Sequence, residues 1–90
     1  MYEIYIHKQA QKVIQKAQTR IKLKTKKALE HLIQNGTNNF PFKIDILKGE
    51  FQKYQYFEIK IDKDFRIFCR LENKTFFIRA AGTHNQLHTG

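Results

Sequence analysis

The segment "YQYFEIKIDKDFRIFCRLENKTFFIRAA", residues 54–81, contains three hydrophobic runs that are separated by the short polar links "DKD" and "ENK". Each run is rich in aromatic and β-branched residues and alternates hydrophobic with polar side chains, which is typical of β-strands. Links this short join strands that run antiparallel to each other. The segment therefore predicts an antiparallel meander with strands at residues 54–61, 65–71 and 75–81.

Two further strands and a helical region precede this meander. "KIDILKG" at 43–49 and "YEIYI" at 2–6 alternate in the manner of strands. Residues 8–33 place hydrophobic side chains three and four positions apart, which is the period of an amphipathic helix. Thr19 has the side chain of an N-cap, so we expect a hairpin of two helices rather than one long helix. Gly36 in "QNG" is expected to cap its C-terminal end.

This order of elements predicts an α+β fold, with an N-terminal strand and a helical hairpin packed on a twisted, mainly antiparallel sheet. Ninety residues are enough for one hydrophobic core, so we expect a single domain at residues 1–90. Eight Phe and four Tyr provide burial area without a metal or disulfide staple. The single cysteine, Cys69, lies in a hydrophobic run, and we expect a buried, unreactive thiol.

Net charge is the strongest signal of composition. The chain has 17 Lys and Arg against 8 Asp and Glu, a formal charge of +9. Such an excess favours a polyanion, an acidic protein or an anionic membrane as partner. A membrane is the least favoured, because no predicted helix joins a strong apolar face to Trp or Phe anchors. With no membrane-spanning run and no signal-peptide pattern, the expected location is the cytoplasm.

Many of these cations lie in the helical region and form what we call the basic stripe: Lys8, Lys12, Lys16, Arg20 and Lys24, which recur every four residues, with Lys22, Lys26 and Lys27. Like charges four residues apart weaken a helix by a few tenths of a kcal/mol per pair. The stripe therefore indicates contact with an anion, either RNA phosphates or an acidic protein segment. The alternative is a solvated helix face without a partner.

A second cluster of charge is expected on the sheet. Strand alternation leaves one face open, and this face carries Glu58, Lys60 and Asp62 from one strand and Arg66, Phe68 and Arg70 from the next. Cations beside an exposed aromatic ring are typical of surfaces that bind single-stranded RNA. The alternative is that the acidic and basic side chains only pair with each other across the strands.

The C-terminal "GTHNQLH" at 82–88 places His84 and His88 directly after the last strand. An imidazole exchanges a proton near neutral pH. Beside Lys60 and Arg66, it would complete the acid, base and phosphate-stabilising groups that a ribose 2′-OH needs to attack its own phosphodiester without a metal. The histidines could instead be metal ligands, although no HExxH motif, cysteine pair or carboxylate cluster accompanies them, or belong to a polar tail.

The whole pattern resembles the RelE/ParE superfamily of bacterial type II toxins. The resemblance covers nearly all of the chain and is carried by the order of elements, by "LKG" at 47–49, by "FEIKIDKDFRIFCRL" at 57–71 and by "AAGTHNQL" at 80–87. The ending is similar to the "G-[ST]-H-x-x-L-[F]" terminus of the YafQ branch. The resemblance implies a RelE-like fold and a ribosome-dependent mRNA endonuclease that a cognate antitoxin neutralises.

The resemblance also implies residue roles. His84 falls on the terminal catalytic histidine of the YafQ branch, and Asp64 falls on an acidic residue that precedes its next strand. Lys60 stands where YafQ-like proteins have a second histidine and RelE-like proteins a functional lysine. Arg66, in "FRIFC", matches the arginine of the RelE "YRLVY"-type strand. His88 departs from the family, because it replaces a terminal aromatic residue that is thought to pack on a base.

On this basis His84 is expected to act as general acid or base, and Lys60 as its counterpart in proton transfer or as a cation at the transition state. Arg66 would hold the scissile phosphate, and Asp64 would orient a neighbouring cation or histidine. The expected substrate-binding residues are Lys48, Lys53, Lys63, Arg79 and His88, the first four on rRNA or mRNA phosphates. The basic stripe is left for rRNA or an acidic antitoxin, and neither a metal nor another cofactor is expected.

Two other functions remain open at this stage. ParE-like members of the superfamily poison DNA gyrase and lack the nuclease residues, and a plain RNA-binding module would need no catalytic group. The presence of Lys60, Arg66 and His84 favours the nuclease.

Overall fold

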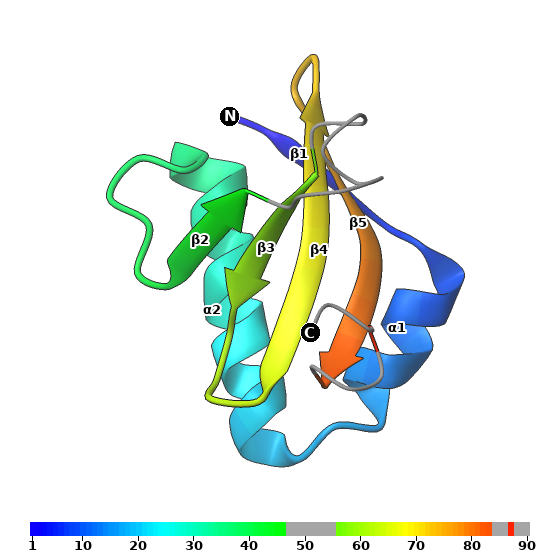
Figure 1. The fold of residues 1–90 in the computed structure, drawn as a ribbon. Helices are drawn as coiled ribbons and strands as arrows, with labels where there is room; N and C mark the ends of the chain where they lie inside the picture. The colour runs from blue at the N-terminus through cyan, green and yellow to red at the C-terminus, as the bar shows by residue number, and fades with distance from the viewer. Residues whose placement is uncertain (47–55, 84–86, 88–90) are drawn as a thin grey trace.

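A computed structural model describes residues 1–46, 56–83 and 87 of the chain. Its elements are β1 (Glu3–Ile6), α1 (Lys8–Gln15), α2 (Thr19–Asn35), β2 (Lys43–Ile46), β3 (Phe57–Lys60), β4 (Phe65–Glu72) and β5 (Thr75–Thr83). The strands form one sheet in the order β1-β5-β4-β3-β2. The two helices precede four of the five strands in the chain and lie together at one side of the sheet (Figure 1).

The sheet is mainly antiparallel, as the short links predict. β2, β3, β4 and β5 pair antiparallel in sequence order, whereas β1 pairs parallel with β5. A parallel pair needs a long crossover between its strands, and the helices with the first part of the meander provide it. The expected α+β fold, with an N-terminal strand and a helical hairpin on a mainly antiparallel sheet, is therefore confirmed.

The helical hairpin is also confirmed, with one correction at its second helix. Thr19 is the first residue of α2 rather than its N-cap, and Gln18 occupies the cap position without a side-chain hydrogen bond. At the other end, Gly36 adopts φ 63°, a conformation that glycine tolerates best. A Cβ there would lie 2.8 Å from Cε2 of Tyr2, so both the backbone and the packing require glycine at this cap.

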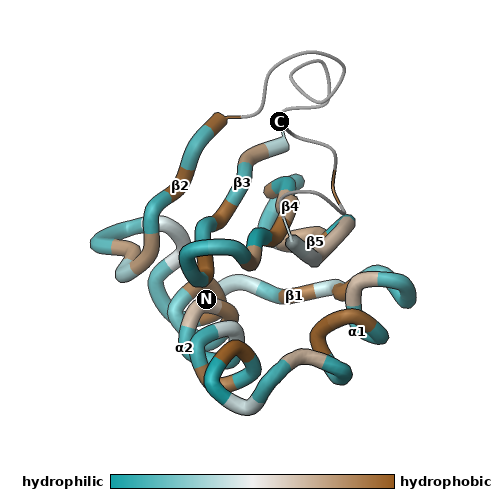
Figure 2. The backbone as a smooth tube through the Cα atoms, turned by 60° about the horizontal axis from the view of Figure 1, so that its bottom comes forward, coloured by the Kyte–Doolittle hydropathy of each residue, from teal (hydrophilic) through white to brown (hydrophobic). Residues whose placement is uncertain are grey.

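The hydrophobic core lies between the helices and one face of the sheet. Figure 2 shows hydrophobic and hydrophilic segments alternating along both helices, as amphipathic packing requires. Ala28 and Leu32 of α2 are buried in the same cluster as Ile59, Ile67 and Phe76 of the sheet. Each fully buried side chain of this size stabilises the fold by roughly 1.5–3 kcal/mol. The opposite face of the sheet is thus free to carry polar groups.

β3 and β5 differ from their expected limits. β3 begins at Phe57 and ends at Lys60, so Tyr56 and Ile61 lie outside it, and β5 is longer than expected at its C-terminal end. β5 runs through Gly82 to Thr83, although the hydrophobic run ends at Ala81. Its register with β4 shifts between Phe68 and Cys69, since Phe68 pairs with Ala80 while Cys69 pairs with Ile78. This leaves Arg79 as the extra residue of a β-bulge, an irregularity that redirects a side chain.

The lone thiol is buried, as its hydrophobic run predicts. Cys69 is a free, buried cysteine, and burial raises the pKa of its thiol to about 12, so the reactive thiolate is not formed near neutral pH. Neither helix in the described part of the chain has the length and apolar character needed to cross a bilayer.

Candidate functional site

The pairing register gathers cations in one row across the open face of the sheet. Lys43 of β2 lies opposite Lys60 of β3, and Lys60 lies opposite Arg66 of β4. Paired residues of neighbouring strands point to the same face, and like charges directly opposite each other repel. We call Lys43, Lys60 and Arg66 the cation row. Its next position, on β5, is Gly82, which adds no side chain.

The neighbouring row on the same face is acidic. Asp45 lies opposite Glu58, and Glu58 lies opposite Phe68. Two diagonal ion pairs join this row to the cations, Lys60 Nζ to Asp45 Oδ2 at 3.0 Å and Arg66 Nη1 to Glu58 Oε1 at 2.9 Å. The hydrogen bond from Lys60 lowers the pKa of the Asp45 carboxyl. The acidic row therefore compensates the repulsion among the cations.

The Glu58–Arg66 pair differs from the other ion pairs in its burial. The Arg66 side chain is 15% exposed and that of Glu58 is 8% exposed, and in none of the other ion pairs of the described residues are both partners as buried. Arg66 also donates from Nη2 to the carbonyl of Lys63 at 3.5 Å, the limit of a hydrogen bond. Its Nε is buried and has no hydrogen-bond partner among the described residues.

The expectation of an exposed aromatic ring between two arginines is wrong. Phe68 does lie on the same strand between Arg66 and Arg70, but it is only 1% exposed. Glu58, expected on an open surface, is buried as well. The cross-strand pairing of acidic and basic side chains, which the sequence left open as the alternative, is what the structure shows for Glu58 and Arg66.

Arg70, four residues further along β4, has a different environment. Its guanidinium lies 5.8 Å from the ring centre of Tyr56 and 5.3 Å from that of Phe77, and its Nη2 pairs with Glu72 Oε2 at 3.1 Å. Phe77 in turn contacts Tyr5 of β1. This end of the open face is thus an aromatic cluster around a cation, and we call it the aromatic end.

Two hydrogen-bonded ion pairs join the link between β3 and β4 to helix α2. Asp62 accepts hydrogen bonds from Lys24 Nζ at 2.9 Å and Arg20 Nη2 at 3.1 Å, and the bond from Lys24 lowers the pKa of its carboxyl. The backbone N–H groups of Ile61 and Asp62 both donate to the carbonyl of Phe65. We call this link, residues 61–64, with Lys60 and Arg66 on either side, the turn end.

The predicted site residues on this turn are exposed. Lys63 and Asp64 both lie at the surface. The Lys63 carbonyl contacts the cation row by accepting the hydrogen bond from Arg66 Nη2. No ion pair of Asp64 is present among the described residues, so its expected orienting role stays a prediction.

Asp62 forms ion pairs with two members of the basic stripe. It binds Arg20 and Lys24, which therefore have a structural role that the sequence pattern does not indicate. The rest of the stripe is exposed: Lys8, Lys12, Lys16, Lys22, Lys26 and Lys27.

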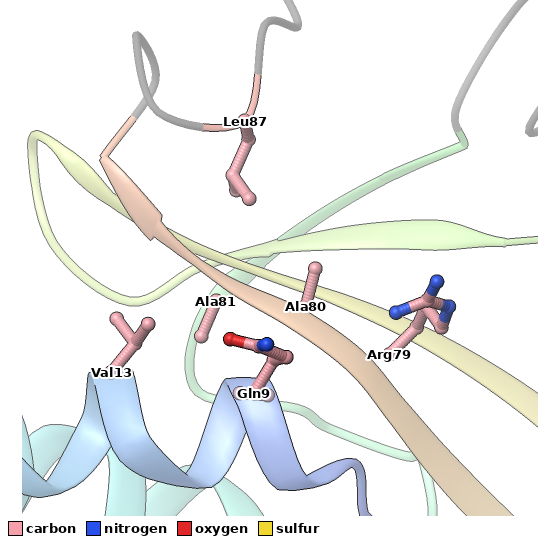
Figure 3. A pocket seen from close by; sticks show the side chains of 7 residues that line it. Gln9, Val13, Arg79, Ala80, Ala81 and Leu87 are labelled. Atoms are coloured by element: carbon pink, nitrogen blue, oxygen red, sulfur yellow. The ribbon is translucent and has the colours of Figure 1, made fainter.

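Arg79 lies at the bulge of β5, away from the cation row. It lines a pocket of about 260 Å³ together with Gln9 and Val13 of α1, Ala81 and Leu87 (Figure 3). Figure 3 shows the Arg79 side chain at one end of this pocket and Leu87 on the opposite side of β5 from α1. Arg79 is exposed, as a contact to RNA phosphates requires, but the structure does not join it to Lys60 or Arg66.

Four of the predicted site residues, Lys48, Lys53, His84 and His88, lie outside the described residues. The last described position before His84 is Thr83, which lies opposite Phe65, next to Arg66. No group of three His, Cys, Asp or Glu side chains is placed to hold a metal ion within residues 1–46, 56–83 and 87.

Glu58 is the residue that sequence reasoning did not include in the site. The available signal was its place two positions before Lys60 on the same strand face. Its burial could not be read from this alternation, because the acidic row of a sheet with an open face is expected at the surface.

Comparison with solved structures places this fold among bacterial and archaeal toxins. YafQ from E. coli strain BL21(DE3) superposes with a TM-score of 0.79 at 24% identity, over 97% of this chain and 98% of that one. The RelB–RelE antitoxin–toxin complex from Methanococcus jannaschii gives 0.77 at 17% identity, over 92% and 93%. YoeB from Staphylococcus aureus gives 0.75 at 18% identity, over 92% and 97%. No protein-family model and no curated protein matches the sequence.

Proposed function

We propose that this protein, which has the RelE-like fold, is the toxin of a type II toxin–antitoxin system and cleaves mRNA on the ribosome without a metal ion. The observation that carries the proposal is the register of the sheet. It sets Lys60 opposite Arg66 and Arg66 opposite Gly82, two residues before His84 in the sequence. Two cations and the segment leading to an imidazole thus meet at the turn end.

These groups match the needs of cleavage by the ribose 2′-OH. A base removes the 2′-OH proton, the 2′ oxygen forms a bond to phosphorus, and the P–O5′ bond breaks as an acid protonates the leaving oxygen. The products are a 2′,3′-cyclic phosphate and a 5′-OH. Negative charge develops on the phosphate oxygens in the transition state, where a fixed cation stabilises it.

Each residue then has a proposed role. His84 is the general acid or base, because an imidazole titrates near neutral pH. Lys60 is its counterpart in proton transfer or a cation at the transition state, and Arg66 binds the scissile phosphate. Asp64 orients a neighbouring cation or histidine. The proposed contacts to RNA are Lys48, Lys53, Lys63, Arg79 and His88.

The proposed partners follow from charge and from the structural neighbours. One neighbour is a complex of RelE with RelB and another is a complex of E. coli YafQ with DinJ. A chain with a net charge of +9 would be neutralised by an acidic antitoxin. The same charge favours rRNA and mRNA in the cytoplasm, where binding would weaken as salt rises.

A reconstituted translation reaction tests the proposal. Purified protein is added to ribosomes stalled on a defined mRNA, and the 5′ ends of the fragments are mapped and their end groups identified. We expect cuts in register with the codons, a 5′-OH on the downstream fragment, and no cuts in the same mRNA without ribosomes. A 5′-phosphate would exclude attack by the 2′-OH. Uncut mRNA together with inhibited DNA supercoiling by gyrase would favour the non-nuclease toxin instead.

A further inference from the structure

Glu58 is a buried acid at the centre of the proposed site, and the roles given above leave it unused. A buried ion pair is seldom kept for stability alone, because desolvation of both charges offsets much of their attraction. Glu58 also lies directly opposite a second carboxylate, Asp45, in the register, a placement that costs stability. A function in the site would explain why the chain keeps this arrangement.

The atoms that Glu58 contacts suggest this function. Glu58 Oε1 binds Nη1 of Arg66. The two remaining donors on the other edge of the guanidinium, Nε and Nη2, point in the same direction and form the fork that grips two oxygens of a phosphate at once. In Arg66 Nε has no partner among the described residues, and Nη2 has only the 3.5 Å contact to the Lys63 carbonyl.

Arg70 provides the internal comparison. Its Nε is also buried and without a partner among the described residues, but its Nη2 is occupied by Glu72. One of the two fork nitrogens is therefore bonded, and the guanidinium lies near the rings of Tyr56 and Phe77, with the Arg70 side chain 31% exposed. The two arginines of one strand face thus differ in which nitrogen their acidic partner binds, Nη1 in Arg66 and Nη2 in Arg70.

We propose that Glu58 is a positioning residue: by binding Nη1, it fixes the Arg66 guanidinium so that the Nε–Nη2 fork receives the scissile phosphate. The inference rests on the proposed function, since Arg66 there binds that phosphate. Glu58 itself does not touch the RNA. Its loss therefore slows the chemical step through misplacement of Arg66, while binding of the mRNA through the other cations is retained.

The matched variants are Glu58→Gln and Glu72→Gln, which make the same change in the two arginine pairs of β4. Gln keeps the shape of the side chain and an oxygen acceptor but loses the charge. The first readout is the nitrogen NMR spectrum of the arginine side chains. We expect rotation of the Arg66 guanidinium to be slow in the wild type, faster in Glu58→Gln and unchanged in Glu72→Gln. Unchanged rotation in Glu58→Gln overturns the proposal.

The second readout is cleavage of mRNA in ribosome complexes, with rates normalised to folded protein. For Glu58→Gln we expect kcat to fall at least tenfold while KM changes less than threefold, and Glu72→Gln to keep the wild-type values. Glu58→Asp keeps the charge and recovers part of kcat, and it serves as the main variant if Glu58→Gln does not fold. A wild-type kcat, or a rise in KM alone, in the Glu58 variant overturns the positioning role.

The two readouts separate this inference from the proposed function. If the wild-type chain cleaves no mRNA, the proposed function fails, and the NMR comparison still decides whether Glu58 fixes Arg66. If the wild type cleaves and Glu58→Gln cleaves equally well, only the positioning role fails.

Discussion

Arg66 and Arg70 lie four residues apart on the same strand face, yet they are held in opposite ways. At the turn end, the buried carboxylate of Glu58 binds Nη1 of Arg66, and the Nε and Nη2 atoms of Arg66 have no strong hydrogen-bond partner among the described residues. Arg70, at the aromatic end, lies near two rings and is paired at Nη2 with an acid whose side chain is 54% exposed.

Under the proposed function, this difference gives one residue type two purposes on one sheet. A guanidinium that lies near two aromatic rings is attracted to them, so part of its interaction capacity is used within the fold, although the Arg70 side chain is 31% exposed. A guanidinium that is held at one nitrogen keeps two donors for an anion, and in Arg66 one of them, Nε, is buried without a partner among the described residues. We therefore propose substrate binding for the turn end and packing for the aromatic end.

Of the differences expected between the two arginines, the largest is in activity. Arg66→Lys keeps a positive charge near Glu58 but removes the fork, so we expect mRNA cleavage to slow by about 10² to 10³-fold, as on loss of one donor at a developing anion. Arg70→Lys, the matched control, is expected to cleave within about threefold of the wild type, because we give Arg70 no ligand. Equal losses in both variants would remove the distinction between the two ends.

A smaller effect concerns the strength of the two ion pairs. Double-mutant cycles on the free energy of unfolding compare Glu58→Gln and Arg66→Met with Glu72→Gln and Arg70→Met. We expect a coupling of about 2–4 kcal/mol for the buried pair, because removing one partner leaves a buried charge. For the exposed pair we expect less than about 1 kcal/mol. Urea titration measures both couplings. A Glu58–Arg66 coupling no larger than that of the exposed pair would contradict the expectation that burial strengthens it.

The smallest effect depends on pH. The pKa values of Asp45 and Asp62 are lowered by Lys60 and Lys24. Carboxyls with a lowered pKa stabilise the fold above their unfolded pKa of about 3.9, and this contribution is lost as the pH falls through the folded pKa. Asp62 lies in the turn end, and Asp45 pairs with Lys60 of the turn end. Acid should therefore loosen the turn end first.

Hydrogen exchange of single amides tests this order. Between pH 5 and pH 3, and after correction for the intrinsic rate, the amides of Ile61 and Asp62 should lose protection before that of Arg70. In Asp62→Asn the turn should be less protected already at pH 5 and should change less on acidification. Simultaneous loss of protection at both ends would contradict the view that the ion pairs of Asp45 and Asp62 stabilise the turn.

Much of the fold could be predicted because its signals are local. Alternation and short links in residues 54–81 predict the meander, the hydrophobic period and Gly36 predict the helical region, and Thr19 predicts its division into two helices. The N-cap of α2 was misplaced by one residue, because Gln18 has the cap backbone without a capping side chain. The extension of β5 through Gly82 depends on pairing with Phe65 and Arg66, which no local pattern contains.

The candidate site was less predictable for the same reason. Alternation placed Lys60 and Arg66 on one face, and the register confirms that they are neighbours. It could not indicate that Phe68 and Glu58 are buried on the face opposite the helices, since burial depends on the packing of the whole chain. Nor could helical spacing show that Asp62, far away in sequence, binds Arg20 and Lys24.

The most direct test of the central claim, that this fold carries a nuclease site at the turn end, is removal of the histidine that follows β5. His84→Ala is compared with the wild type and with His31→Gln, a histidine of α2 that contacts the Asn38 carbonyl. We expect cleavage of mRNA on the ribosome to fall about 10² to 10⁴-fold in His84→Ala, with relief of growth arrest and an unchanged melting temperature, and His31→Gln to stay active. A fully active, fully toxic His84→Ala protein would contradict the account.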